Sequence, residues 1–161
     1  MSFSYRPLHA WADQPRINID EFLQRFAVQA SQFSDKEKDI GPDFEFTCRY
    51  TIKDGRENRE QWVIWLSKIS SDPRQAAHTV SEIESARADA GSDDENVAML
   101  KIDSGLCTAM RLTEDIVNST CIGIRKGFLL MVGTPQKQGA GPTAPPVGAS
   151  NLFERVSSRL P

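Results

Sequence analysis

The stretch "GLCTAMRLTEDIVNSTC", Gly105–Cys121, decides the fold, because it predicts a β-hairpin that carries two of the chain's three cysteines. Its polar centre, Thr113–Asp115, suits a three-residue reversal. With a loop of that length, Cys107 lies directly opposite Cys121. Residues in direct opposition have Cα atoms about 4.5–5.5 Å apart, which is within the range of a disulfide.

The state of these cysteines bears on the compartment, and the sequence leaves alternatives open. A slip of one residue in the register would send the two side chains to opposite faces of the sheet. Three is an odd number, so Cys48 could instead bond to one of the pair, or all thiols could stay reduced. We predict a Cys107–Cys121 disulfide. It would close a loop of about 15 residues and contribute on the order of 3 kcal/mol.

Alternation of polar and apolar side chains predicts the other strands. In residues 44–52 every second side chain is apolar, which is typical of a strand with one solvated face. The next strand places Trp62, Ile64 and Leu66 on one face, and Val63 and Trp65 on the other. That pattern predicts either a central strand or a Trp65 that the N-terminal segment covers. Further strands are predicted at 97–103, at 106–112, and on both sides of the turn at 125–127.

Three segments have the spacing of an amphipathic helix. Residues 18–33 carry an apolar stripe, and Asn18 with Glu21 forms a capping box. Residues 72–91 begin with an Asp-Pro cap and end at a glycine. The stripe predicted to pack closely on the sheet in this second helix comprises Ala76, Ala77, Val80 and Ile83. A last short helix is predicted to begin at Ser150 or Asn151.

These elements define an α+β fold with two layers: a mainly antiparallel sheet of about five to six strands, with helices packed on one face. We expect an extended N-terminal segment (1–16), an α+β domain (17–133) and a Pro/Gly/Ala-rich loop or tether (134–149). The C-terminal helix (150–161) would then pack back on the domain.

Composition excludes several classes of function. The net charge is -3, and the 19 Lys and Arg residues form no run, so we expect no nucleic-acid partner. No apolar stretch is long enough to span a membrane. The start of the sequence lacks a signal peptide, which is compatible with a cytoplasmic protein or with a periplasmic or secreted domain after processing.

The residues that usually carry out catalysis are scarce. There is no glycine-rich phosphate loop, and the two histidines lie far in sequence from the cysteines. We therefore predict no catalytic residue, no metal and no cofactor, and expect His78 at the surface. Two acidic loops could face a basic partner; their residues are Asp93, Asp94, Glu95, Glu114 and Asp115.

A set of short motifs resembles a known group of domains. The motifs, in chain order, are Cys48-Arg49-Tyr50, a helix from Pro73, Gly105-Leu106-Cys107-Thr108-Ala109, Arg125-Lys126-Gly127 and Arg159-Leu160-Pro161. Their order is similar to that in small extracytoplasmic, sensor-like lipoprotein domains of actinobacteria, and the likeness covers about two thirds of the chain. The resemblance implies a non-catalytic, exported domain. No lipobox cysteine stands at the start, and no functional residue can be transferred.

The leading hypothesis is thus a non-enzymatic extracytoplasmic binding or sensor-like domain. One alternative is an interaction protein, such as a toxin-immunity protein, that covers a basic site of its partner. Another is a small enzyme that uses a groove between sheet and helices.

The face assigned to Trp62 can be tested directly. If this side chain lies in the core, Trp62→Ala lowers the free energy of unfolding by about 3–5 kcal/mol, since a large cavity remains. Urea denaturation measures the change. A loss of less than about 1 kcal/mol would show that the opposite face of this strand is the buried one.

Overall fold

A computed structural model gives the fold. It describes all residues except 1–16, 37–44, 55–57, 69–72, 90–94 and 138–141, so the expected N-terminal segment lies outside the described residues. The elements are α1 (Ile19–Lys36), β1 (Glu45–Asp54), β2 (Asn58–Lys68), α2 (Pro73–Ala88), β3 (Val97–Ile102), β4 (Gly105–Arg111), β5 (Ile116–Arg125), β6 (Phe128–Lys137) and α3 (Val147–Ser157).

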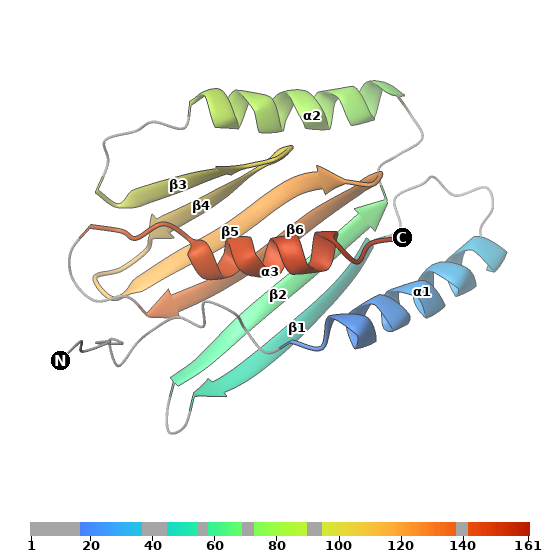
Figure 1. Cartoon of the computed structure of the whole chain (residues 1–161), viewed down its shortest axis with the longest axis horizontal. Coiled ribbons are helices and arrows are strands. Elements are labelled where there is room, and N and C mark those ends of the chain that lie inside the picture. Colours follow the sequence, from blue (N-terminus) through green and yellow to red (C-terminus); the bar gives the residue numbers. More distant parts are fainter. Residues whose placement is uncertain (1–16, 37–44, 55–57, 69–72, 90–94, 138–141) are drawn as a thin grey trace.

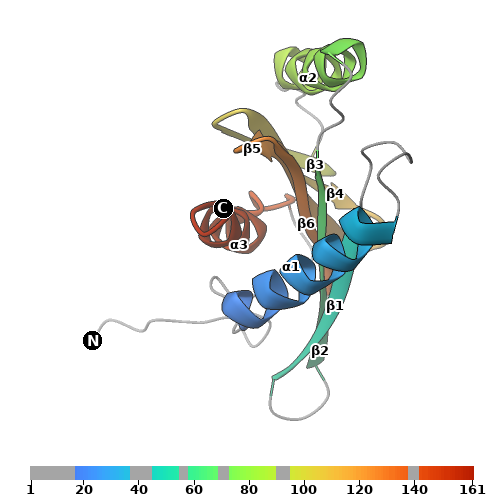
Figure 2. The same cartoon turned by 90° about the vertical axis from the view of Figure 1, so that its right-hand side faces the viewer.

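The six strands form one antiparallel sheet in the order β1-β2-β6-β5-β4-β3 (Figure 1). The strands β3 to β6 follow one another as a meander, and β6 returns to pair with β2. Helices α1 and α3 pack on one face, whereas α2 lies beyond the β3 side of the sheet (Figures 1 and 2). The predicted α+β fold is therefore confirmed, and so is the position of β2 as an internal strand.

One row of side chains crosses the whole sheet and fixes which face is buried. The row consists of Cys48, Ile64, Val132, Cys121, Cys107 and Leu100, one residue from each strand. All of them belong to, or pack against, the core cluster that includes the buried side chains of α1 and α3. We call this side of the sheet the closed face.

The predicted hairpin register is confirmed within this row. Cys107 and Cys121 are direct partners across β4 and β5 and are joined as a disulfide, with Cα atoms 4.0 Å apart. Cys48 is a buried free thiol in the same row. Strands β2 and β6 stand between it and the disulfide, so about 14 Å separates β1 from β5. That distance excludes a bond from Cys48 to either partner.

Aromatic packing attaches α1 to the closed face. The Asn18 side chain accepts a hydrogen bond from the Glu21 N–H (3.1 Å), which satisfies one open donor of the first turn, as the sequence predicts. Phe22 and Phe26 then meet Phe46 of β1 at ring-centroid distances of 5.4 and 6.0 Å. The helix thus covers the β1 side of the sheet.

Small residues let α3 approach the sheet closely. Gly123 of β5 and Gly105 of β4 are direct partners, next to the disulfide row. A Cβ atom on Gly123 would lie 2.8 Å from the ring of Phe153, so only glycine leaves room for this side chain. Phe153 is fully buried there, together with Leu152 and Val156.

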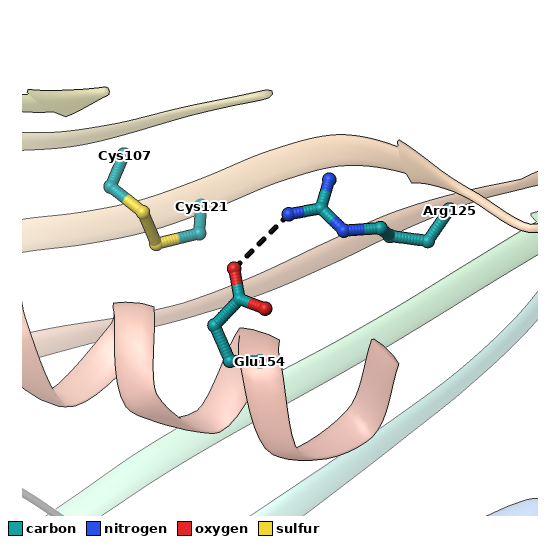
Figure 3. The surroundings of a disulfide bond; sticks show 4 residues. All are labelled: Cys107, Cys121, Arg125 and Glu154. Atoms are coloured by element: carbon teal, nitrogen blue, oxygen red, sulfur yellow. Dashed lines mark hydrogen bonds and ion pairs between the residues drawn. A yellow bond between two sulfur atoms is a disulfide. The ribbon is translucent and has the colours of Figure 1, made fainter. Parts of the chain in front are cut away.

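Arg125 ties α3 to the end of β5. Its guanidinium forms an ion pair with Glu154 at 3.1 Å (Figure 3). It also lies 5.0 Å from the ring centre of Phe153 and donates to the Asp103 carbonyl. The turn that follows has positive φ at Lys126 and Gly127, which is the backbone of a tight two-residue hairpin. The Lys126 ammonium reaches the Leu160 carbonyl at 2.7 Å and holds the end of the chain.

The expected loop at 134–149 was wrong at both ends. Strand β6 continues to Lys137, and Thr134 is buried because it pairs within the sheet. Helix α3 begins at Val147 after Pro146, without a side-chain cap, rather than at Ser150 or Asn151. The earlier start needs no polar cap in the sequence, because Pro146 holds the N-cap position, and the small Gly148 and Ala149 of the first turn are buried.

The predicted packing stripe of α2 is confirmed at Ile83 and wrong at Ala77 and Val80, while the side chain of Ala76 lies outside the described ones. Val80 is 44% exposed and Ala77 is exposed, whereas Ile83 is 8% exposed and flanked by the half-buried Thr79 and Arg87. These three residues repeat every fourth position and form the inner side of the helix. Among the described side chains of α2, Ile83 is the one buried apolar residue, and Ala77 does not mark the inner side of the helix.

The disulfide gives a stability prediction. Cys107→Ala/Cys121→Ala lowers the free energy of unfolding by about 2–4 kcal/mol, because the unfolded chain regains the freedom of the closed loop. Thiol titration in denaturant should give one reactive thiol without reductant and three after reduction. In the Cys48→Ala control, the unreduced protein should give none. Three reactive thiols before reduction would contradict the disulfide.

Candidate binding surface

The cysteines of the opening hairpin do not form a reactive site. Cys107 and Cys121 are completely shielded from solvent, between the sheet and α3 (Figure 3). A buried disulfide without a neighbouring thiol has no attacking group for exchange. Its role in this structure is to hold the register of β4 and β5.

The structure brings the described parts of the two predicted acidic loops to one end of the sheet. Glu114 and Asp115 lie exposed in the β4–β5 turn. The Arg111 N–H at the end of β4 bonds to the Asn96 carbonyl (2.7 Å), so the exposed Glu95 is at the same end. Asp93 and Asp94 lie outside the described residues. The Arg111 guanidinium donates to the Glu114 carbonyl (2.7 Å), so this acidic end also contains a cation.

Other classes of site find little support in the described residues. There, no cluster of three or more His, Cys, Asp or Glu is arranged to hold a metal ion. His78 is a surface residue of α2, as expected, and lies 3.2 Å from the Glu82 carboxylate one turn away. None of the described helices is long and apolar enough to cross a membrane.

One titratable group on the closed face has an altered pKa. The Tyr50 hydroxyl is shielded from solvent beside the Cys48 thiol. Burial, and next the neighbouring thiol, raise the pKa of Tyr50 well above its ordinary value, since both disfavour the phenolate. Tyr50 therefore stays neutral at physiological pH and acts as a packing residue of the core.

The opposite side of the sheet, which we call the open face, carries apolar side chains that α1 and α3 do not reach. They alternate with the core residues along β2, β5 and β6, because successive side chains of a strand point to opposite faces. The half-buried apolar residues are Val63, Trp65, Ile116, Ile122, Ile124, Leu129 and Met131. Ile116 lies at the other end of β5, and we call the remaining six, which adjoin one another, the apolar strip.

A central row organises the strip. Trp65 pairs with Met131, Met131 with Ile122, and Ile122 with Leu106 of β4. Unlike the first three, Leu106 is buried, at 6% exposure. Helix α2 contacts β4, the strand of Leu106. Over β2, β6 and β5 the row stays half exposed.

Two charged residues border the strip on β1. Arg49 is the direct partner of Val63, and Glu45 is the direct partner of Ser67. Both side chains are exposed, and among the described residues neither forms a salt bridge. The strip therefore lies next to an anion and a cation four residues apart on the same strand.

The sequence contains a signal for this surface on the second face of two strands. Val63 and Trp65 on the second face of β2 indicated either a central strand or a covered tryptophan. The same pattern occurs on β6, where Leu129 and Met131 alternate with core residues. A strand that is apolar on both faces cannot, by sequence alone, be assigned to a double-sided core or to a binding face.

No protein-family model matches the chain, and comparison with curated proteins and with solved structures likewise yields no match. The resemblance to extracytoplasmic lipoprotein domains thus stays a prediction. The case for function rests on the surface itself.

The altered pKa of Tyr50 gives a pH-dependence prediction. The folded state keeps its proton at a pH where the unfolded state loses it, so stability is retained below about pH 10 and falls as the pH rises further. Tyr50→Phe should flatten this fall. Urea denaturation between about pH 9 and pH 11 measures both slopes. An equally steep fall in the variant would show that Tyr50 is not its source.

Proposed function

We propose that the chain is a non-enzymatic binding domain of an extracytoplasmic compartment, and that the apolar strip of the open face is where a partner protein binds. One observation carries the proposal: six neighbouring apolar side chains are only half-buried on a face of the sheet that α1 and α3 leave uncovered. A contiguous exposed apolar surface on a folded domain usually marks an interaction site.

The compartment is inferred from the disulfide. Such bonds persist where the environment is oxidising and are rare in the cytosol. The cytoplasmic alternative would require a buried disulfide to form under reducing conditions, and so we place the domain outside the cytoplasm.

The side chains of the strip favour binding over catalysis. Its six side chains are aliphatic, thioether or indole groups, which supply no general acid, base or nucleophile. They favour the burial of an apolar partner surface.

A second candidate rests on a different surface. Glu95, Glu114 and Asp115 share one end of the sheet and could cover a basic site, as an immunity protein does. Arg111 at the same end reduces the local negative charge, which is why we rank this candidate second.

Photo-crosslinking in the organism that encodes the chain distinguishes the two candidates. A photoreactive residue would replace Ile124 in the strip, Glu114 at the acidic end or, as control, Val28, which is 56% exposed on α1. We expect a discrete protein adduct from position 124 alone.

Adducts from position 114 alone would replace the proposal with the second candidate. No adduct at position 124, or equal adducts at all three positions, would count against the strip as a binding surface. Thermal unfolding of each variant confirms that the fold is intact.

A further inference from the structure

We infer that the occupant of the apolar strip is a single amphipathic helix of the partner protein, which presents an acidic residue to Arg49 and a basic residue to Glu45. This inference rests on the proposed function and adds the shape and the charge pattern of the partner.

The dimensions of the strip suit one helix. It extends over the three neighbouring strands β2, β6 and β5, whose outer axes are about 10 Å apart. A helix with its side chains is about 10–12 Å across. On the fourth strand, β4, the strip ends, because Leu106 there is buried. A partner helix would thus cover β2, β6 and β5.

Backbone hydrogen bonding favours a helix over an extended segment. A strand laid on the face of a sheet finds no backbone partners, because the groups of β2, β6 and β5 are already paired with each other. A helix satisfies its own N–H and C=O groups and offers only side chains. The closed face already uses this solution, where α3 packs over β5 and β6.

The character of the strip defines the contact side of the partner. Trp65, Met131 and Ile122 form its central row, and Gly133 lies on the same face of β6 beside Met131. A wide aromatic, a flexible thioether and a glycine provide a broad and adaptable surface. They would receive an apolar stripe spaced at three and four residues along the partner helix.

The charges on β1 fix the flank of the partner. Glu45 and Arg49 lie four residues apart along the strand, which corresponds to about 13 Å. Two helical turns cover about 11 Å, so a basic and an acidic residue about two turns apart on the partner can reach both. The same pair sets the direction of the helix, because reversing it would place like charges together.

A display library tests the inference directly. The probe is a phage library of amphipathic helices of about 18 residues, in which the apolar stripe and the flanking positions are randomised among apolar, acidic, basic and neutral residues. It is selected against the oxidised full chain. We expect enriched peptides to share an apolar stripe and to carry one acidic and one basic residue about two turns apart on one flank.

Variants of the chain then locate the bound peptide. Met131→Lys should weaken binding of an enriched peptide by more than about thirtyfold, since it places a charge in the centre of the contact. The milder Ile122→Thr keeps a β-branched side chain in the strand and should weaken binding in the same direction. Val28→Lys on α1 is the matched control and should leave the affinity unchanged.

A charge exchange tests the orientation. Glu45→Arg/Arg49→Glu keeps the net charge of the chain and should weaken the enriched peptide on the order of tenfold. A peptide with its own two charges exchanged should recover the loss. Fluorescence anisotropy at low salt measures all these affinities.

Several results would overturn the inference. In the selection, these are failure to enrich any helix or enrichment of helices without the charge pair. In the affinity measurements, it is an affinity that Met131→Lys and Ile122→Thr leave unchanged. In sedimentation, it is a dimer of this chain whose interface covers the strip. If crosslinking at position 124 still yields an adduct, the proposed binding surface stands and only the helical partner is rejected. If both experiments fail, the binding surface is rejected as well.

Discussion

The register between β4 and β5 is the constraint on which the rest of the molecule depends. Because side chains alternate along a strand, the opposition of Cys107 and Cys121 assigns every residue of both strands to a face. The ladder carries this assignment across the sheet, to Leu100 on one edge and Cys48 on the other. A slip of one residue between the two strands would send Cys107 and Cys121 to opposite faces, and a threonine, Thr108 or Thr120, would take the buried place of one of them. The disulfide makes that slip impossible while the chain is folded.

The closed face follows from this register. The same pairing that aligns the cysteines aligns Gly105 with Gly123, and the resulting hollow receives Phe153. The ring of Phe153 in turn lies beneath the guanidinium of Arg125, whose ion pair with Glu154 returns to the same helix. Two residues of β5 therefore set the position of α3 on the sheet. Gly123 leaves room for Phe153, and Arg125 pairs with Glu154. All of these contacts lie on the closed face, so none of them involves a side chain of the open face.

The sequence revealed those parts of the structure that depend on local pattern. Alternation identified the strands, the polar centre of one hairpin gave its register, and Asn18 marked the start of α1. The start of α3 was not predicted, because the helix follows Pro146 without a side-chain cap, so no capping residue marks its first turn in the sequence. The side of α2 that faces the rest of the protein was not predicted for a related reason. A helix in which Ile83 is the one buried apolar side chain among those described has a weak periodic signal, and Ala77 and Val80 suggested a contact side that tertiary packing did not use.

The open face is harder to predict because its central strands are apolar on both sides. Trp65 and Met131 are half-buried by their neighbours, and alternation alone does not give that degree of exposure. The closed face supports this surface from behind. Since the disulfide row, the glycine pair and the two helices fix the backbone from behind, the strip keeps its shape without an occupant. A surface that is ordered before binding loses little conformational entropy on association, so even a contact area as small as one helix can be used efficiently.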